Sequence, residues 1–354
     1  HIPAADVVFG TSALASLPGL LEEAFADTGK NVEVDTLEEG RGFSCDLPSR
    51  RAQKFHAWVP IMTGCNNFCT YCIVPYVRGR EKSRTIEAVV GECEKLVADG
   101  VREITLLGQN VNSYGRNIYG EPKFAELLRK VAATGIERVR FTSSNPHDLT
   151  DETISAMAEL PCVMPHLHLA VQSGSTRVLK AMNRKYTREQ YLELAGRLKA
   201  AMPDLALSTD IIVGFPGETE EDFEETLSLV KEAAFSSAYT FIYSPRPGTP
   251  AAKIADDTPH EVIQNRFDRL ADLVAQQAHD ANQGDLGKAV SVLVEGSSKR
   301  DDSVMVGHSE KMRTVHFLLP DGANPSDYVG KICNVKVVEA RTWYLRGEIE
   351  GDPR

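Results

Sequence analysis

Short apolar runs alternate with segments of helical periodicity through the middle of the chain. The helical segments, with an apolar residue every three or four positions, cover 86–98, 124–132, 151–159, 187–200 and 219–232. The apolar runs are rich in Val, Ile and Leu, as strands buried on both faces are, and cover 57–62, 104–107, 139–142, 167–171, 205–213 and 239–243. Strands that alternate with helices predict parallel pairing, and six such units predict an open (β/α)6 partial barrel of the α/β class.

The pattern changes toward both ends of the chain. Residues 1–54 contain a strand-like run at 7–9, a helical pattern at 14–25 and a polar linker at 33–49, and we interpret them as the remnant of an N-terminal α/β domain. A long helix is predicted over 259–282. Beyond it, short strands with Gly or Asp-Gly turns predict a small all-β barrel, at 289–294, 304–306, 315–319, 332–338 and 345–349. We therefore divide the chain into 1–54, 55–283 and 284–351.

Composition places the chain among ordinary globular proteins. Its 354 residues are 42% hydrophobic, and no apolar run is long enough to span a membrane, so we expect a soluble protein without a membrane partner. Seven cysteines, an odd number, fit a reducing compartment, and we expect the cytoplasm. The chain begins with His1 rather than Met and enters directly into a strand-like run, from which we expect a piece of a longer protein.

The charge is uneven along the chain. Considered for the chain as a whole, a formal net charge of −11 argues against nucleic acid as a binding partner. From residue 289 onward, however, nine basic residues face ten acidic ones, and four cations are bunched: Lys299, Arg300, Lys311 and Arg313. This end of the chain therefore permits contact with RNA, although such bunches are more often plain solvated surface.

Each of the six predicted strands is followed by a polar or glycine-rich segment. These segments are 65–72, 108–110, 143–145, 172–175, 214–218 and 244–248. Because the carboxyl ends of parallel strands meet at one edge of a sheet, six segments in the same relative place predict a single site there.

The first of these segments carries three cysteines. Cys65, Cys69 and Cys72 have C-x₃-C-x₂-C spacing, and three thiolates on one loop can hold three corners of a four-iron cubane, which leaves one iron open for a small molecule. Cys69 and Cys72 alone would be an ordinary zinc or redox pair. A zinc site would need a fourth ligand, for which His56 is the nearest candidate, and a disulfide cannot use an odd trio.

The cysteine spacing, with Tyr71 before the last cysteine, resembles the radical SAM superfamily. The resemblance implies a 4Fe-4S cluster on Cys65, Cys69 and Cys72 that cleaves S-adenosylmethionine to a 5′-deoxyadenosyl radical. Residues that can hold the cofactor follow at the strand ends. Gly108 and Gln109 suit the methionine end, Ser143 and Gln172 can bond ribose or carboxylate, Arg184 can pair with the carboxylate, Asp210 can accept from the ribose, and Tyr71 can lie against adenine. For Gln172 and Asp210, a purely structural role as polar residues that cap the end of a strand is as well supported by the sequence as cofactor binding.

Longer motifs resemble the methylthiotransferase family of radical SAM enzymes. They lie at 64–75, 107–114, 140–143, 168–175, 182–187, 210–219 and 243–251. The resemblance implies a tRNA-modifying enzyme that converts N6-dimethylallyladenosine beside the anticodon to its 2-methylthio derivative. The run from Gln172 to Ser175 favours this branch over those that modify a ribosomal-protein aspartate or threonylcarbamoyladenosine, while Ala170 departs from a usual Pro.

The family also implies partners. It predicts a TRAM domain at 284–351 that grips RNA through Lys299, Arg300, Lys311 and Arg313, a tRNA anticodon stem–loop as substrate, flavodoxin or ferredoxin as electron donor, and a monomer. A second, auxiliary 4Fe-4S cluster needs three further cysteines, and this sequence does not contain them, since Cys45, Cys93, Cys162 and Cys333 are scattered. We therefore expect cofactor cleavage without completed methylthiolation. A non-catalytic RNA-binding module and a radical SAM transfer to protein stay open as alternatives.

Overall fold

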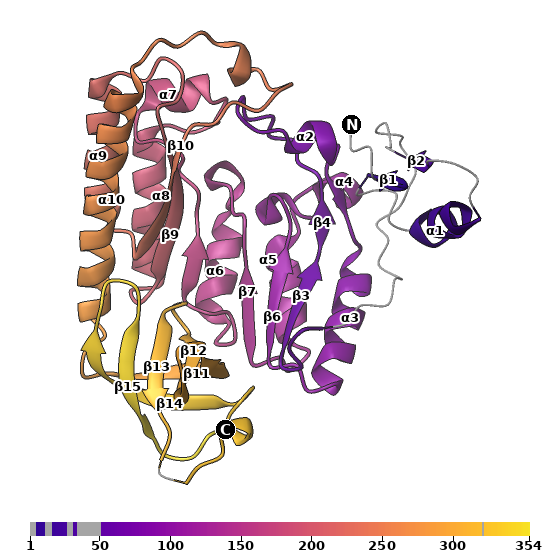
Figure 1. Cartoon of the computed structure of the whole chain (residues 1–354), viewed down its shortest axis with the longest axis vertical. Helices are drawn as coiled ribbons and strands as arrows, with labels where there is room; N and C mark the ends of the chain where they lie inside the picture. The colour runs from indigo at the N-terminus through magenta and orange to yellow at the C-terminus, as the bar shows by residue number, and fades with distance from the viewer. Residues whose placement is uncertain (1–4, 11–15, 27–30, 34–50, 321) are drawn as a thin grey trace.

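The computed structural model describes residues 5–10, 16–26, 31–33, 51–320 and 322–354 (Figure 1). At the N-terminus, β1 (Val7–Phe9) pairs in parallel with β2 (Asn31–Glu33), and α1 (Leu17–Phe25) lies between them in sequence. The strand at 7–9 is confirmed, and the helix begins three residues later than expected. Apart from Glu33, the predicted linker lies outside the described residues, as does Cys45.

Six parallel strands form the central sheet, and their order in the sheet follows their order in the chain. β3, β6 and β7 pair as one group and β8, β9 and β10 as another, and single parallel bridges join the groups between Val139 and Val163 and between Ser144 and Leu169. The strands are β3 (His56–Pro60), β6 (Glu103–Leu107), β7 (Arg138–Phe141), β8 (His166–His168), β9 (Ala206–Val213) and β10 (Ser237–Ile242). Within the described chain β3 and β10 do not pair, so the barrel is open, as predicted.

Helices follow the strands and lie on one side of the sheet, which leaves the other side open (Figure 1). They are α3 (Ile86–Ala98), α5 (Phe124–Ala132), α6 (Asp151–Glu159), α7 (Thr176–Ala181), α8 (Arg188–Ala201), α9 (Glu220–Ala233) and α10 (His260–Gln283). Threonine caps set several of their starts. Thr187 and Thr219 each accept a hydrogen bond from the N3 backbone, and the N3 side chain bonds back, which is the capping box.

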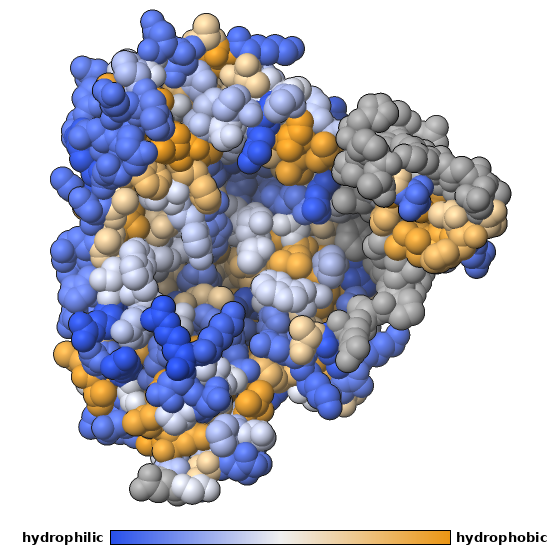
Figure 2. All heavy atoms as spheres, in the orientation of Figure 1, coloured by the Kyte–Doolittle hydropathy of each residue, from blue (hydrophilic) through white to orange (hydrophobic). Residues whose placement is uncertain are grey.

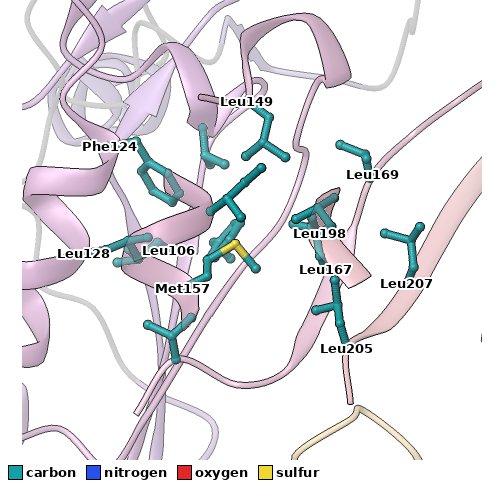
Figure 3. Close-up of a cluster of buried hydrophobic side chains, with 14 of the residues drawn as sticks. Leu106, Phe124, Leu128, Leu149, Met157, Leu167, Leu169, Leu198, Leu205 and Leu207 are labelled. Atoms are coloured by element: carbon teal, nitrogen blue, oxygen red, sulfur yellow. The ribbon is translucent and has the colours of Figure 1, made fainter. Parts of the chain in front are cut away.

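The main core lies between the sheet and these helices. In Figure 3, Phe124 and Leu128 of α5 point toward Leu106 of β6 and Met157 of α6. All four side chains are at most 3% exposed, so the apolar faces that periodicity predicts for α5 and α6 are buried against the sheet. Two short helices and one hairpin complete the domain: α2 (Val74–Val77), α4 (Arg116–Tyr119), and β4 (Met62–Thr63) paired with β5 (Lys82–Ser83).

The C-terminal strands close into a barrel in the order β11-β12-β13-β15-β14. They are β11 (Ala289–Ser298), β12 (Asp301–Ser309), β13 (Thr314–Leu318), β14 (Ile332–Ala340) and β15 (Leu345–Glu350). A small core of Val, Met, Phe and Leu side chains fills this barrel. The predicted all-β barrel is therefore confirmed, with β11 and β12 longer than expected.

The small barrel docks at the amino ends of the central strands. Arg138 of β7 donates to the Ser291 carbonyl at 2.8 Å, and Arg140 donates to the Ser309 carbonyl at 2.8 Å. Both arginines are buried. The C-terminal barrel thus lies at the end of the sheet opposite the predicted site (Figure 1). Among the described helices, none combines the length and the apolar composition needed to cross a membrane.

Candidate functional site

The cysteine loop follows β4 and can exist only with glycine at its start. Gly64 has φ +78°, and a Cβ there would lie 2.2 Å from the Arg80 carbonyl oxygen. The chain comes this close because Cys65 N–H donates to the Gly79 carbonyl at 3.2 Å. The sequence therefore folds a tight turn that brings Cys65 to the carboxyl end of the sheet.

Contacts from distant segments hold the rest of the loop. Asn183, itself at φ +57°, donates from Nδ2 to the Phe68 carbonyl at 2.9 Å. Thr70 N–H donates to the Met182 carbonyl at 3.0 Å, and Ala251 N–H donates to the Thr70 carbonyl at 2.9 Å. Loops after two other strands thus fix the cysteine loop, which pre-organises its side chains.

The three thiols are close enough to affect one another electrostatically. Cys69 is 8% exposed, and Cys65 and Cys72 are partly buried. Burial raises the pKa of Cys65 to about 11, and the negative charges of Glu81, Cys69 and Cys72 also raise this pKa. Burial and then Cys69 likewise raise the pKa of Cys72. Without a cation these two groups stay protonated at neutral pH, so ligation of a metal centre is what would hold them as thiolates.

The trio does not form a site for one ion. Among the described residues, no three His, Cys, Asp or Glu side chains converge as ligands of a single metal ion. The cysteines of a four-iron cubane do not have to point at one atom, because each of them binds a different iron. His56, the candidate fourth ligand for zinc, is hydrogen-bonded to Thr105 Oγ1 at 3.1 Å. The donor set therefore suits a cluster better than a zinc ion.

Arg184 connects the cysteine loop to the end of β8. Its Nη1 lies 3.5 Å from the Cys69 sulfur, its Nη2 donates to the Ala170 carbonyl at 2.7 Å, and its Nε donates to the Tyr186 hydroxyl at 2.8 Å. Sequence reasoning assigned Arg184 to a carboxylate and missed the sulfur contact, because nothing in the local sequence brings residues 69 and 184 together.

Tyr71 lies partly buried beneath the loop. It packs against a small apolar cluster of Val178, Met182, Phe215 and Ala251. Burial raises the pKa of Tyr71 well above its ordinary value, so the hydroxyl stays protonated. Its predicted place against adenine remains a prediction.

The end of β6 carries the next predicted residues. Gly108 is buried, and a Cβ there would lie 2.6 Å from Cγ of Met62, so close packing against β4 requires this glycine. Gln109 follows, and its Oε1 is buried without a hydrogen-bond partner in the described chain. The same holds for Oγ of Ser144 after β7 and for the hydroxyl of Tyr243 after β10. Three strand ends thus offer polar atoms to a bound group.

Two predicted residues have a left-handed backbone. Ser143 has φ +62° and Gln172 has φ +72°, and both follow neighbouring strands. Residues other than glycine adopt this region at a cost of ~1–3 kcal/mol, and such residues cluster at functional sites. Gln172 is 8% exposed, and its backbone pairs with both Asp210 and Ile212 of β9. The strain is consistent with a site at these strand ends.

Asp210 belongs to a line of polar side chains on β8 and β9. His168 Nε2 lies 3.2 Å from Asp210 Oδ2, and Ser208 Oγ lies 3.1 Å from both His168 Nδ1 and His166 Nε2. These side chains alternate along the strands and line a cavity of about 460 Å³ on the open side of the sheet. Figure 2 shows this side of the molecule hollowed between the two halves of the sheet. Sequence reasoning missed His166, His168 and Ser208, although their period of two was a usable signal.

The four predicted RNA contacts separate into two pairs. Lys299 and Arg300 are exposed at the turn between β11 and β12 and line a groove of about 1200 Å³ over the C-terminal barrel. Lys311 instead faces the central sheet, where Nζ lies 3.2 Å from Asp204. Arg313 is mostly buried and donates to the Ser236 carbonyl at 3.1 Å. Contact with RNA by any of them stays a prediction. The role that the structure shows for Arg313 is its hydrogen bond to Ser236, which joins the C-terminal barrel to the central sheet.

Two family models match the chain. Residues 59–230 match the radical SAM superfamily and residues 285–349 match the TRAM domain. Among curated relatives, the tRNA-2-methylthio-N(6)-dimethylallyladenosine synthase of Geobacillus kaustophilus (strain HTA426) is 49% identical over 97% of this chain and 64% of its own length. The synthase of Clostridium botulinum (strain Okra / Type B1) is 48% identical over 98% of this chain and 76% of its own length. The chain thus spans about two-thirds to three-quarters of these relatives.

Solved structures resemble the chain more distantly. TsrM from Kitasatospora setae, a radical S-adenosylmethionine methyltransferase, aligns over 55% of this chain and 38% of its own with 19% identity and a TM-score of 0.47. The Escherichia coli coproporphyrinogen III oxidase HemN aligns over 82% of this chain and 68% of its own with 13% identity and a TM-score of 0.46.

Proposed function

Since the chain belongs to the family of tRNA-2-methylthio-N(6)-dimethylallyladenosine synthases within the radical SAM superfamily, we propose that it carries the radical-generating and RNA-binding parts of a tRNA methylthiotransferase. Its substrate is then N6-dimethylallyladenosine beside the anticodon, presented by a tRNA stem–loop. The observation that carries this proposal is the cysteine trio, on a loop fixed by segments that follow two other strands, at the carboxyl end of an open parallel sheet.

Cys65, Cys69 and Cys72 would hold a 4Fe-4S cluster. When bound, this cluster supplies the electron that cleaves S-adenosylmethionine to a 5′-deoxyadenosyl radical. The chain's own residues hold the reactants. Arg184 uses three of its five N–H donors on Tyr186, Ala170 and Cys69, which leaves two for the carboxylate of the cofactor. This would orient the methionine end beside the loop.

The remaining strand ends would hold the rest of the cofactor. Gly108 and Gln109 would receive the methionine end, and the buried Gln109 Oε1, which lacks a donor in the described chain, can accept from its ammonium group. Ser143 and Gln172 would donate to ribose or carboxylate, Asp210 would accept from ribose hydroxyls, and Tyr71 would border the adenine. An auxiliary cluster has no candidate ligands in the described chain, because Cys93 lies on α3, Cys333 on β14 and Cys162 between α6 and β8.

The test is anaerobic reconstitution of this 354-residue chain with iron and sulfide. We expect about four irons per chain and, with reductant and S-adenosylmethionine, release of 5′-deoxyadenosine without methylthiolated RNA. Cys69→Ala removes one corner of the cluster and should abolish 5′-deoxyadenosine, whereas Cys93→Ala, which changes a buried cysteine of α3, should retain it. If Cys69→Ala released as much 5′-deoxyadenosine as the unaltered chain, the proposed site would be refuted. Methylthiolated product from this chain alone would refute the proposal that it cleaves the cofactor without completing methylthiolation.

A further inference from the structure

The cavity of about 460 Å³ lies between the open side of the sheet and the C-terminal barrel, and both domains line it. Its volume is within the ~300–1,000 Å³ typical of pockets for small ligands. One wall consists of the polar side chains of β8 and β9 described above. The opposite wall comes from the turn before β13, the turn before β15 and the end of α10.

Three large apolar side chains surround this cavity and are exposed. Tyr239 of β10 is 60% exposed, Trp343 before β15 is 62% exposed and Met312 before β13 is 44% exposed. Met312 has φ +62°, so its turn is held in a conformation that is unfavourable for a side chain. Exposed apolar groups from three separate segments around one hollow indicate a ligand that covers them.

One buried acceptor in the cavity wall has no donor. Asn282 is 3% exposed, and its Nδ2 donates to the Arg341 carbonyl at 2.7 Å and to the Thr342 carbonyl at 3.1 Å. These two bonds fix which end of the amide is nitrogen. Its Oδ1 is buried and receives no hydrogen bond from the described residues, although the residue lines the cavity. A ligand with an N–H donor at its edge would satisfy this oxygen.

The polar wall holds a single acidic side chain beside two histidines and a serine. Burial lowers the pKa of His166 to about 3, so this imidazole is neutral, and Ser208 joins it to His168. Asp210 is the acidic side chain of the cavity lining. On the other side, Lys311 and Arg313 are ion-paired with Asp285 at 3.7 and 3.8 Å. The cavity therefore suits a flat, uncharged group with hydrogen-bonding edges rather than a phosphate.

We propose that this cavity binds an unpaired nucleobase of the RNA, stacked on Trp343 and Tyr239, with its exocyclic amino group donating to Asn282 Oδ1. The proposal rests on the proposed function, which supplies RNA as the partner. Bases of single-stranded loops are recognised by stacking on aromatic rings and by hydrogen bonds to their edges. In this role the C-terminal barrel contributes a wall of a base-binding cavity and not only a surface for the RNA backbone.

The test uses the two tryptophans of the chain. Trp58→Phe leaves Trp343 as the single fluorescent reporter in the full, cluster-reconstituted chain. We expect a hairpin RNA with an adenine-containing loop to quench Trp343 emission, and a blunt duplex of the same composition to leave it unchanged. In the same background Trp343→Ala should weaken hairpin binding roughly 10-fold, while Trp343→Phe, which keeps a ring to stack on, should stay within about 3-fold.

A second arm addresses the base edge. Replacing the loop adenosines by purine ribonucleoside, which lacks the amino group, should weaken binding by the wild-type chain roughly 3- to 10-fold. Unchanged Trp343 emission with saturating hairpin, or equal hairpin affinity of Trp343→Ala and wild type, overturns the proposal. Failure of the proposed function has a separate readout, since 5′-deoxyadenosine release is measured without RNA.

Discussion

Arg184 gives Cys69 a partner that a search for cluster ligands alone does not reveal. Its positively charged N–H lies 3.5 Å from the Cys69 sulfur. In the proposed cluster, such a donor would stabilise the more reduced and therefore more negative state. Arg184 is itself fixed by the Ala170 carbonyl and the Tyr186 hydroxyl, so its distance to the sulfur does not depend on a bound cofactor. It thus links the end of β8 to the electronic properties of the site.

At the residue scale we therefore predict that Arg184→Gln lowers the reduction potential of the reconstituted cluster. A shift of about 60 mV corresponds to a tenfold change in a one-electron equilibrium and is the size we expect. Spectroelectrochemical titration of the cluster absorbance measures it. Lys180→Gln, which removes an exposed charge from α7, is the control and should leave the potential unchanged. An unaltered potential in Arg184→Gln would show that the sulfur contact has no electronic consequence.

At the scale of elements, the sequence was informative where a local signal coincides with a structural boundary. The helices at 86–98 and 151–159 were predicted with the ends that the structure has, because apolar periodicity and a threonine cap, Thr85 or Thr150, agree there. The helix at 124–132 also has its predicted ends, from apolar periodicity alone, since Lys123 at its N-cap makes no side-chain cap. The strand predicted over 167–171 ends at His168. Beyond it the chain makes only isolated bridges, at Leu169 and Gln172, and Gln172 has a left-handed backbone. These features depend on tertiary contacts, which the apolar run does not reveal. α7 was missed because six residues are too short for periodicity to be visible.

The same reasoning applies to the site. The cysteine spacing is a local signal, and the order of strands and helices places its loop at the carboxyl end of the sheet. The contact of Arg184 with Cys69, the line of His166, Ser208 and His168, and the burial of Arg313 join segments far apart in the chain. Charge alone cannot distinguish Arg313, which docks the C-terminal barrel, from Arg300, which is exposed.

The loop after β9 carries a buried carboxyl, Glu218, which contacts both the end of β9 and α10. Glu218 accepts from Gly214 N–H at 2.7 Å and lies 3.6 Å from Arg266 of α10. Burial raises the pKa of Glu218 from its ordinary value of 4.5 to about 7. The folded state therefore binds the proton more tightly than the unfolded state, so this contribution to stability is fully present below about pH 4.5 and is lost as the pH rises through 7.

We predict that wild type becomes less stable relative to Glu218→Gln between pH 5 and 7. Glutamine keeps an acceptor for Gly214 N–H but does not titrate, so the difference in free energy of unfolding should change by roughly 2–3 kcal/mol over this interval. Urea unfolding of both proteins at pH 5, 6 and 7 measures it. Glu232→Gln, at an exposed pair with Arg188 on the outer helices, is the control. Parallel pH profiles of wild type and Glu218→Gln would contradict the assignment.

At the scale of the whole molecule, the two barrels are joined by buried arginines of β7. Arg140 donates to Glu103 at 2.9 Å and also to the carbonyls of Glu310 and Ser309 at 3.0 and 2.8 Å. One side chain thus neutralises a buried carboxylate in the central sheet and caps two backbone acceptors of the C-terminal barrel. Because the proposed nucleobase cavity has walls from both domains, its shape depends on this junction.

Replacing Arg140 by alanine should therefore loosen the junction. Removing one partner of a buried ion pair costs up to ~3–5 kcal/mol when the other charge is left unpaired. Here Glu103 keeps only the longer pair with Arg138 at 3.9 Å, and two carbonyls also lose their donor. We expect Arg140→Ala to lower the melting temperature and to speed proteolytic cleavage between α10 and β11, which releases the C-terminal barrel. Arg129→Ala breaks an exposed pair with Glu159 at 3.1 Å, worth ~1 kcal/mol or less, and should change neither. If Arg140→Ala melts and is cleaved like wild type, the barrels are held together by their other contacts, and the cavity keeps its shape without this arginine.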